Sequence, residues 1–179
     1  MNRMKVARLL LLAPLLGACG WISLPEQWAE DVNFSFSGIP FAPGQVAYLP
    51  SNLAASLGRL PLGLPVRNAS VDADLTYRAN LSASLVHFEL FAVARLPACR
   101  TFTIASGLST LLCPGPSGGR FVGEVVMQPG QTVHVRLKDQ VFAAAARNQT
   151  LYMGVRILDG ITGPNEFFTA SNIRFNARF

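Results

Sequence analysis

Apolar and polar residues alternate with a period of two along much of this chain. The clearest case is the segment 70–82, SVDADLTYRANLS, in which every second side chain is apolar. The apolar row consists of Val71, Ala73, Leu75, Tyr77, Ala79 and Leu81. Successive side chains of a strand point to opposite faces, so this segment is predicted to be a strand with one buried and one solvated face.

Similar alternation predicts strands in segments 33–36, 84–95, 129–137, 150–158 and 172–179. In the segment 84–95 one row is wholly apolar, whereas the other mixes His87 and Glu89 with Phe91 and Val93. We therefore expect part of this second row to be covered as well. Loops rich in glycine and proline separate the alternating runs, which is typical of an antiparallel all-β fold.

One segment favours a helix instead of a strand. Asp139 is a suitable N-cap for 140–147, QVFAAAAR, whose alanines favour helix, and Asn148 is a suitable end. A short helix followed closely by Tyr152 resembles the E-to-F corner of immunoglobulin-like sandwiches. We predict an all-β fold, an antiparallel β-sandwich of about seven to nine strands with one short helix.

The C-terminal segment leaves a second architecture open. Its alternation ends on Phe179, which resembles the assembly signal of outer-membrane β-barrels, and the chain is long enough for eight membrane strands. Alanine-rich apolar rows, the predicted helix and the lack of aromatic girdles favour the sandwich over such a barrel.

The first 20 residues have the pattern of an export signal. Three basic residues, Arg3, Lys5 and Arg8, precede an apolar stretch, 9–16, that is too short to span a membrane as a helix. The residues before Cys19 are small, and LGAC at 16–19 resembles the lipobox of bacterial lipoproteins. We therefore predict a signal peptide at 1–18, a lipidated N-terminus and tether at 19–31, and a sandwich domain at 32–179.

The lipobox resemblance implies that Cys19 is acylated and becomes the mature N-terminus. Two or three acyl chains anchor a protein stably to a membrane. Gly20, where aspartate would signal inner-membrane retention, favours the outer membrane in a bacterium that has one. Trp21 and Trp28 are expected either to settle at the bilayer interface or, for Trp28, to pack on the domain.

The other two cysteines are predicted to form a disulfide. Cys99 and Cys113 are an even pair in a chain bound for an oxidising compartment. The loop that they close has 15 residues, for which chain entropy gives about 3 kcal/mol.

The net charge of +5 belongs mainly to the export signal. Three of the 15 basic residues and none of the 10 acidic ones lie in residues 1–18, so the mature chain carries a net charge of +2. The chain has no cluster of lysine or arginine, which argues against nucleic-acid binding. Only 14% of its residues are charged, so we expect many strands covered on both faces or a surface that meets a membrane or partner.

The sequence offers no convincing catalytic, metal or cofactor site. His87 and Glu89 share a face, and His134 on a neighbouring strand would complete a crude metal site, but both histidines are expected on solvated rows. The chain contains no GxSxG elbow or nucleotide-binding loop.

Two classes of function remain open. We expect a non-catalytic, lipid-anchored envelope module that binds an envelope protein or a cell-wall polymer, or has a structural role. The alternative is a carrier of a small apolar ligand or lipid, suggested by the low charge and the 12 phenylalanines. The segment 58–66, GRLPLGLPV, is expected to cover a sheet edge or to contact a lipid or partner.

Overall fold

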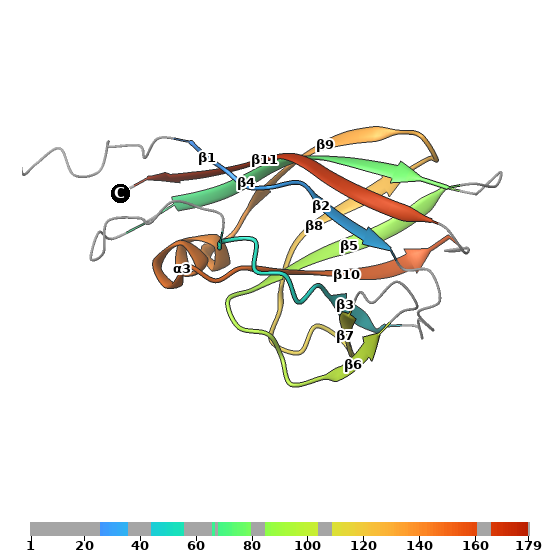
Figure 1. The fold of residues 1–179 in the computed structure, drawn as a ribbon, viewed down its shortest axis with the longest axis horizontal. Coiled ribbons are helices and arrows are strands. Elements are labelled where there is room, and N and C mark those ends of the chain that lie inside the picture. The colour runs from blue at the N-terminus through green and yellow to red at the C-terminus, as the bar shows by residue number, and fades with distance from the viewer. Residues whose placement is uncertain are drawn as a thin grey trace, which may run out of the picture.

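Two antiparallel sheets packed face to face form the molecule (Figure 1). The computed structural model describes residues 26–35, 44–55, 66, 68–79, 85–103, 109–160 and 166–178. The five-stranded sheet contains β1 (Gln27–Trp28), β2 (Val32–Ser35), β4 (Asn68–Arg78), β9 (Thr132–Lys138) and β11 (Phe167–Arg178). The six-stranded sheet contains β3 (Val46–Tyr48), β5 (Val86–Val93), β6 (Arg100–Thr103), β7 (Ser109–Cys113), β8 (Arg120–Met127) and β10 (Tyr152–Asp159).

The predicted all-β sandwich with one short helix is confirmed. All strand pairs of both sheets are antiparallel. The eleven strands of the described residues exceed the predicted seven to nine, because strands as short as β1 and β3 show no alternation in the sequence. The order across the first sheet is β1-β11-β4-β9, with β2 also paired to β11, and across the second it is β6-β7-β3-β10-β5-β8.

The core lies between the two sheets, where the predicted apolar rows meet. Val71, Ala73, Leu75 and Tyr77 of β4 are buried, as are Val86, Phe88, Leu90 and Ala92 of β5. Phe168 of β11 is the centre of an aromatic group, with ring centroids 4.7 Å from Tyr77, 5.2 Å from Phe88 and 5.3 Å from Phe34. The alternation along the sequence therefore predicted the inward faces of both strands.

The helix α3 (Gln140–Asn148) packs at one end of the sandwich. Asp139 is its N-cap, and the Asp139 carboxylate accepts a hydrogen bond of 2.8 Å from the backbone N–H of Val141. The helix ends at Asn148 as predicted, and the left-handed residue that follows is Gln149, with φ of 54°. Phe142 and three alanines of the helix are buried in the core.

A β-bulge in β11 changes which face its side chains occupy. Ser171 is opposite Asp74 and Arg174 opposite Asp72, so β11 has one residue more than β4 between these pairs. Asn172 absorbs the extra residue with φ of 52°, in the left-handed region that asparagine tolerates better than most residues. Even-numbered Phe168 and odd-numbered Ile173 both point into the core as a result.

A second, smaller apolar cluster covers part of the outer face of the six-stranded sheet. It contains Val46, Tyr48, Phe91, Val93 and Cys113, all buried. The mixed row of β5 is thus partly covered, as its sequence indicates.

The disulfide between Cys99 and Cys113 belongs to this second cluster. The structure contains the predicted bond, with the two sulfur atoms 2.05 Å apart. The ring of Tyr48 lies against the backbone of Gly154, where a Cβ atom would be 2.5 Å from the ring, and its hydroxyl donates a hydrogen bond to the carbonyl of Pro116. The Tyr48 hydroxyl thus connects the loop 114–119 to the sheet, and the disulfide connects the end of β7 to Cys99, which precedes β6.

The stability of the domain is expected to fall above pH 10 because of two buried tyrosines. Burial raises the pKa of Tyr48 to about 12. Burial and the hydrogen bond to Glu166 also raise the pKa of Tyr77. The unfolded chain releases these protons near pH 10 whereas the folded chain keeps them, so the stabilisation is complete below pH 10 and is lost as the pH rises.

Each tyrosine contributes a slope of about 1.4 kcal/mol per pH unit above pH 10. Urea unfolding at pH 9, 10 and 11 measures this slope. The Tyr48→Phe variant should show a shallower decline than the natural protein, whatever its stability at pH 9. An unchanged slope in this variant would contradict the assignment.

Candidate functional site

The outer face of the five-stranded sheet carries successive rows of polar and charged side chains. One row of side chains crosses this face at a single level, because Trp28 is opposite Arg174, Arg174 opposite Asp72, and Asp72 opposite Arg136. The next level carries Asn176, Ser70 and Lys138, and the level beyond it carries Arg178 and Asn68. Successive levels lie about 7 Å apart, which is the rise of two residues along a strand.

The first level contains two separate contacts, one between a cation and an aromatic ring and one between a cation and a carboxylate. The guanidinium of Arg174 lies over the ring of Trp28, 5.2 Å from its centroid, and the ring remains 55% exposed. Asp72 is buried, and its carboxylate contacts Arg136 Nε at 3.3 Å and accepts a hydrogen bond of 2.8 Å from Asn176. These contacts place Arg174 against an exposed aromatic ring and Arg136 against a buried carboxylate.

A second carboxylate on the same face is held at the bulge. His134 Nδ1 donates to Asp74 at 2.8 Å, and the Asn172 amide donates to the other carboxylate oxygen at 2.9 Å. The Asn172 hydrogen bond, then the His134 hydrogen bond, with smaller attraction from the positive charges of His134 and Arg174, hold the pKa of Asp74 below its ordinary value. The bulge thus contributes to the outer face as well as to the core.

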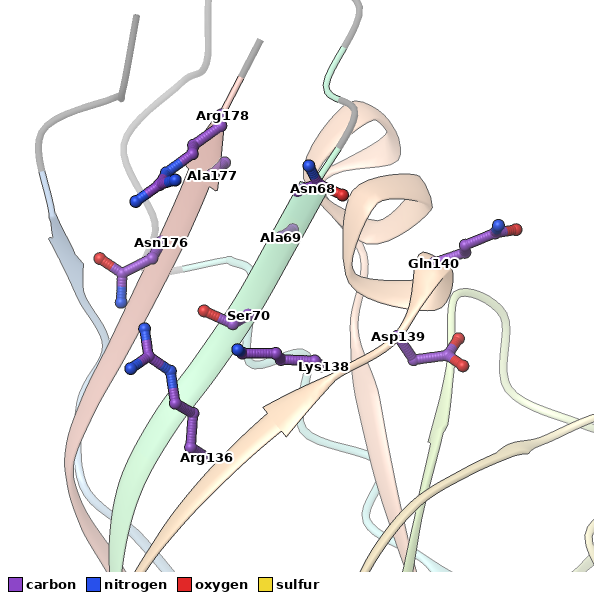
Figure 2. Close-up of a pocket in the computed structure, with 10 residues that line it drawn as sticks. All are labelled: Asn68, Ala69, Ser70, Arg136, Lys138, Asp139, Gln140, Asn176, Ala177 and Arg178. Atoms are coloured by element: carbon purple, nitrogen blue, oxygen red, sulfur yellow. The ribbon is translucent and has the colours of Figure 1, made fainter. Parts of the chain in front are cut away.

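A groove, here called the outer groove, crosses this face near the end of β11. Its volume is about 570 Å³, within the range of about 300 to 1,000 Å³ typical of ligand sites. Residues of β4, β9, β11 and the start of α3 line it, and Figure 2 shows them: Asn68, Ala69, Ser70, Arg136, Lys138, Asp139, Gln140, Asn176, Ala177 and Arg178. Eight of these ten residues are polar or charged.

The outer groove has an excess of positive charge. It contains three basic residues, Arg136, Lys138 and Arg178, and one acidic residue, Asp139. Asp139 is engaged in capping α3 and lies 3.6 Å from Arg120. Within the described part of the chain, Lys138 and Arg178 form no ion pair, so their charges are available to a ligand.

The structure does not bring the two histidines together. His87 lies on β5 of the six-stranded sheet, where its ring is 2.5 Å from Glu124, whereas His134 lies on β9 of the other sheet. Glu89, on the same face as His87, is bound to Arg156 at 2.5 Å. The metal site considered from the sequence would require both histidines and is therefore contradicted by this topology.

Several predicted features lie outside the described residues. Cys19, the signal peptide, Trp21, Phe179 and most of the segment 58–66 are among them. Trp28 is described and lies on the domain, in β1, so the sheet begins within the segment expected to be a tether.

Sequence reasoning missed the outer groove and a buried polar pair in the core. The groove joins residues up to 110 positions apart, such as Asn68 and Arg178, which are paired across β4 and β11. Glu166 is 5% exposed and accepts a hydrogen bond of 2.8 Å from the Tyr77 hydroxyl. Alternation identifies which side chains share a face of one strand but not which strands are neighbours, so neither feature had a signal in the sequence.

Comparison with known proteins gives no family for this chain. No protein-family model matches it, and no curated protein matches it.

Proposed function

We propose that this protein is a non-catalytic module of the bacterial cell envelope, anchored by lipid on Cys19, that binds a cell-wall polymer through the outer groove. The observation that carries the proposal is the groove itself: a recess lined by amide groups and by two cations that form no ion pair among the described residues, on the same sheet face as an exposed tryptophan. Amide and hydroxyl groups that converge on a recess suit the hydroxyl-rich surface of a glycan. The lipobox-like LGAC supports the anchor and, with Gly20, an outer-membrane destination where the cell has one.

Other roles receive less support from the same residues. Eight of the ten residues that line the outer groove are polar or charged, which favours a ligand with polar groups over a wholly apolar one. In the described segments no helix is long and apolar enough to cross a membrane, and the proposed attachment depends on Cys19.

Filling the outer groove should abolish binding to cell-wall material. The Ser70→Phe variant places a large ring in the groove without changing charge, because Ser70 faces outward between Asn176 and Lys138. Co-sedimentation of the protein with insoluble cell-wall material from the producing bacterium measures the effect. We expect a loss of at least tenfold in the bound fraction.

Thr76→Phe is the matched control for this variant. Thr76 lies on the same strand and face but outside the groove, where it shares a hydrogen bond with Thr132. Equal binding by both variants and the natural protein, or no sedimentation of the natural protein, would refute the proposal.

Membrane attachment should depend on Cys19 alone. The Cys19→Ala precursor cannot receive an acyl chain by the lipobox route, so it should appear in the soluble fraction and take up no fatty-acid label. Metabolic labelling with a radioactive fatty acid, followed by fractionation, measures both. Label on the Cys19→Ala chain would show that the anchor is elsewhere.

A further inference from the structure

The charges around the outer groove point to the chemistry of its ligand. We infer that the groove recognises a phosphate or carboxylate group carried by the cell-wall polymer, with Lys138 and Arg178 as the principal contacts. This inference rests on the proposed function and adds the chemical class of the recognised group.

The two cations flank the floor of the groove from opposite sides. Lys138 lies on β9 opposite Ser70, and Arg178 lies on β11 opposite Asn68, so β4 runs between them. The spacing between neighbouring strands is about 4.8 Å, and the two levels are about 7 Å apart, so the cations lie on a diagonal across β4. An oxyanion above Ser70 would have a cation on each side.

Arg136 adds a third positive charge at the edge of this arrangement. Its Nε contacts Asp72, and Figure 2 shows its side chain extending from β9 towards β4. Because Asp72 also accepts a hydrogen bond from Asn176, the anchored Arg136 and Asn176 lie on opposite sides of one carboxylate. Asp72 thus orders Arg136 and Asn176 and offsets the charge of Arg136, so Lys138 and Arg178 are the cations whose charge remains for a ligand.

The shape of the site favours a group on a polymer over a lipid headgroup in the membrane surface. Lys138 and Arg178 share a recess with amides and a hydroxyl, and a recess accepts a group that projects from a chain. Charge attraction to a flat bilayer requires only exposed basic side chains, whereas the outer groove places amides and a hydroxyl beside its exposed cations. A phosphate or carboxylate with neighbouring hydroxyl groups satisfies both kinds of lining residue.

A pair of polymers with the same backbone tests the inference. The full-length lipidated protein is held in nanodiscs of uncharged phosphatidylcholine lipid, and its binding to polygalacturonate and to the fully methyl-esterified polymer is measured. Poly(glycerol phosphate) serves as the phosphate-bearing probe. We expect binding to at least one anionic polymer that weakens with added salt and is lost with the esterified form.

Charge-neutral variants assign the binding to the groove. The Lys138→Gln/Arg178→Gln protein should bind the anionic polymer at least about tenfold more weakly, since hydrogen bonds to charged groups contribute about 1.5 to 3 kcal/mol each. The control is Arg95→Gln/Arg100→Gln, which removes the same charge from exposed positions outside the groove. Circular dichroism verifies that both proteins are folded.

The outcomes separate this inference from the proposed function. Equal binding of anionic and esterified polymers, or an unchanged affinity of the Lys138→Gln/Arg178→Gln protein, overturns the inference and leaves polymer binding intact. Absence of binding to every polymer, including cell-wall material, overturns both. Nanodiscs in which half of the lipid is phosphatidylglycerol provide a competing anionic surface. If polymer binding disappears in them, the groove is assigned to lipid headgroups, and this result also overturns the inference.

Discussion

Replacing Phe168 with alanine is expected to lower the free energy of unfolding by about 3 to 5 kcal/mol. Phe168 is 1% exposed and contacts three aromatic rings, from β2, β4 and β5, so it connects both sheets. Alanine would remove these contacts and leave a cavity that stacked, rigid rings are poorly able to fill. Urea unfolding followed by circular dichroism measures the change.

Phe167→Ala is the matched control for this prediction. Phe167 is the neighbouring residue, but it is 37% exposed and points away from the core, with Arg78 5.9 Å from its ring centroid. We expect this variant to lose about 1 kcal/mol or less. A comparable loss from both variants would contradict the inward and outward assignment of this part of β11.

Removing the disulfide is expected to cost about 3 kcal/mol of stability. The disulfide closes a loop between two residues that are 14 positions apart. In the Cys99→Ala/Cys113→Ala variant this loop is open, so the unfolded chain gains conformational entropy. It also removes the covalent link between Cys113, the last residue of β7, and Cys99, which precedes β6, next to the second cluster. The difference in unfolding free energy between the oxidised natural protein and this variant measures the contribution.

Reduction of the natural protein provides the control. Because both treatments break the same link, the reduced natural protein and the alanine variant should have unfolding midpoints close to each other and below that of the oxidised protein. An oxidised protein no more stable than its reduced form would refute a stabilising role for the bond.

The sequence was sufficient to predict the all-β sandwich and the inward faces of β4 and β5, but not the strands β7 and β8. Alternation identified the buried row of β4, and the alanine-rich run after Asp139 identified the helix, because each depends on residues close together in the chain. The pairing of the cysteines followed from their number and from the expected compartment. These are local or combinatorial properties that require no knowledge of strand order.

The rest of the site depends on contacts between distant parts of the chain. The row from Trp28 through Arg174 and Asp72 to Arg136 comes from four strands whose order the sequence does not encode locally. The bulge at Asn172 also had no signal, because the alternation of 172–179 is regular and conceals the change of face that precedes it. Strand order and register are tertiary properties, and the outer groove depends on both.

The positions of β10 and β11 have a consequence for how the protein is made. These strands are the last in the chain, yet β11 lies between β4 and the two N-terminal strands, and β10 lies between β3 and β5 (Figure 1). Synthesis proceeds from the N-terminus, so the strands made earlier cannot pair with β10 and β11 until these two strands have been made. Neither sheet can be completed before β10 and β11 have been made, so the two layers of the sandwich form late, and the long-range pairings that close them are made together.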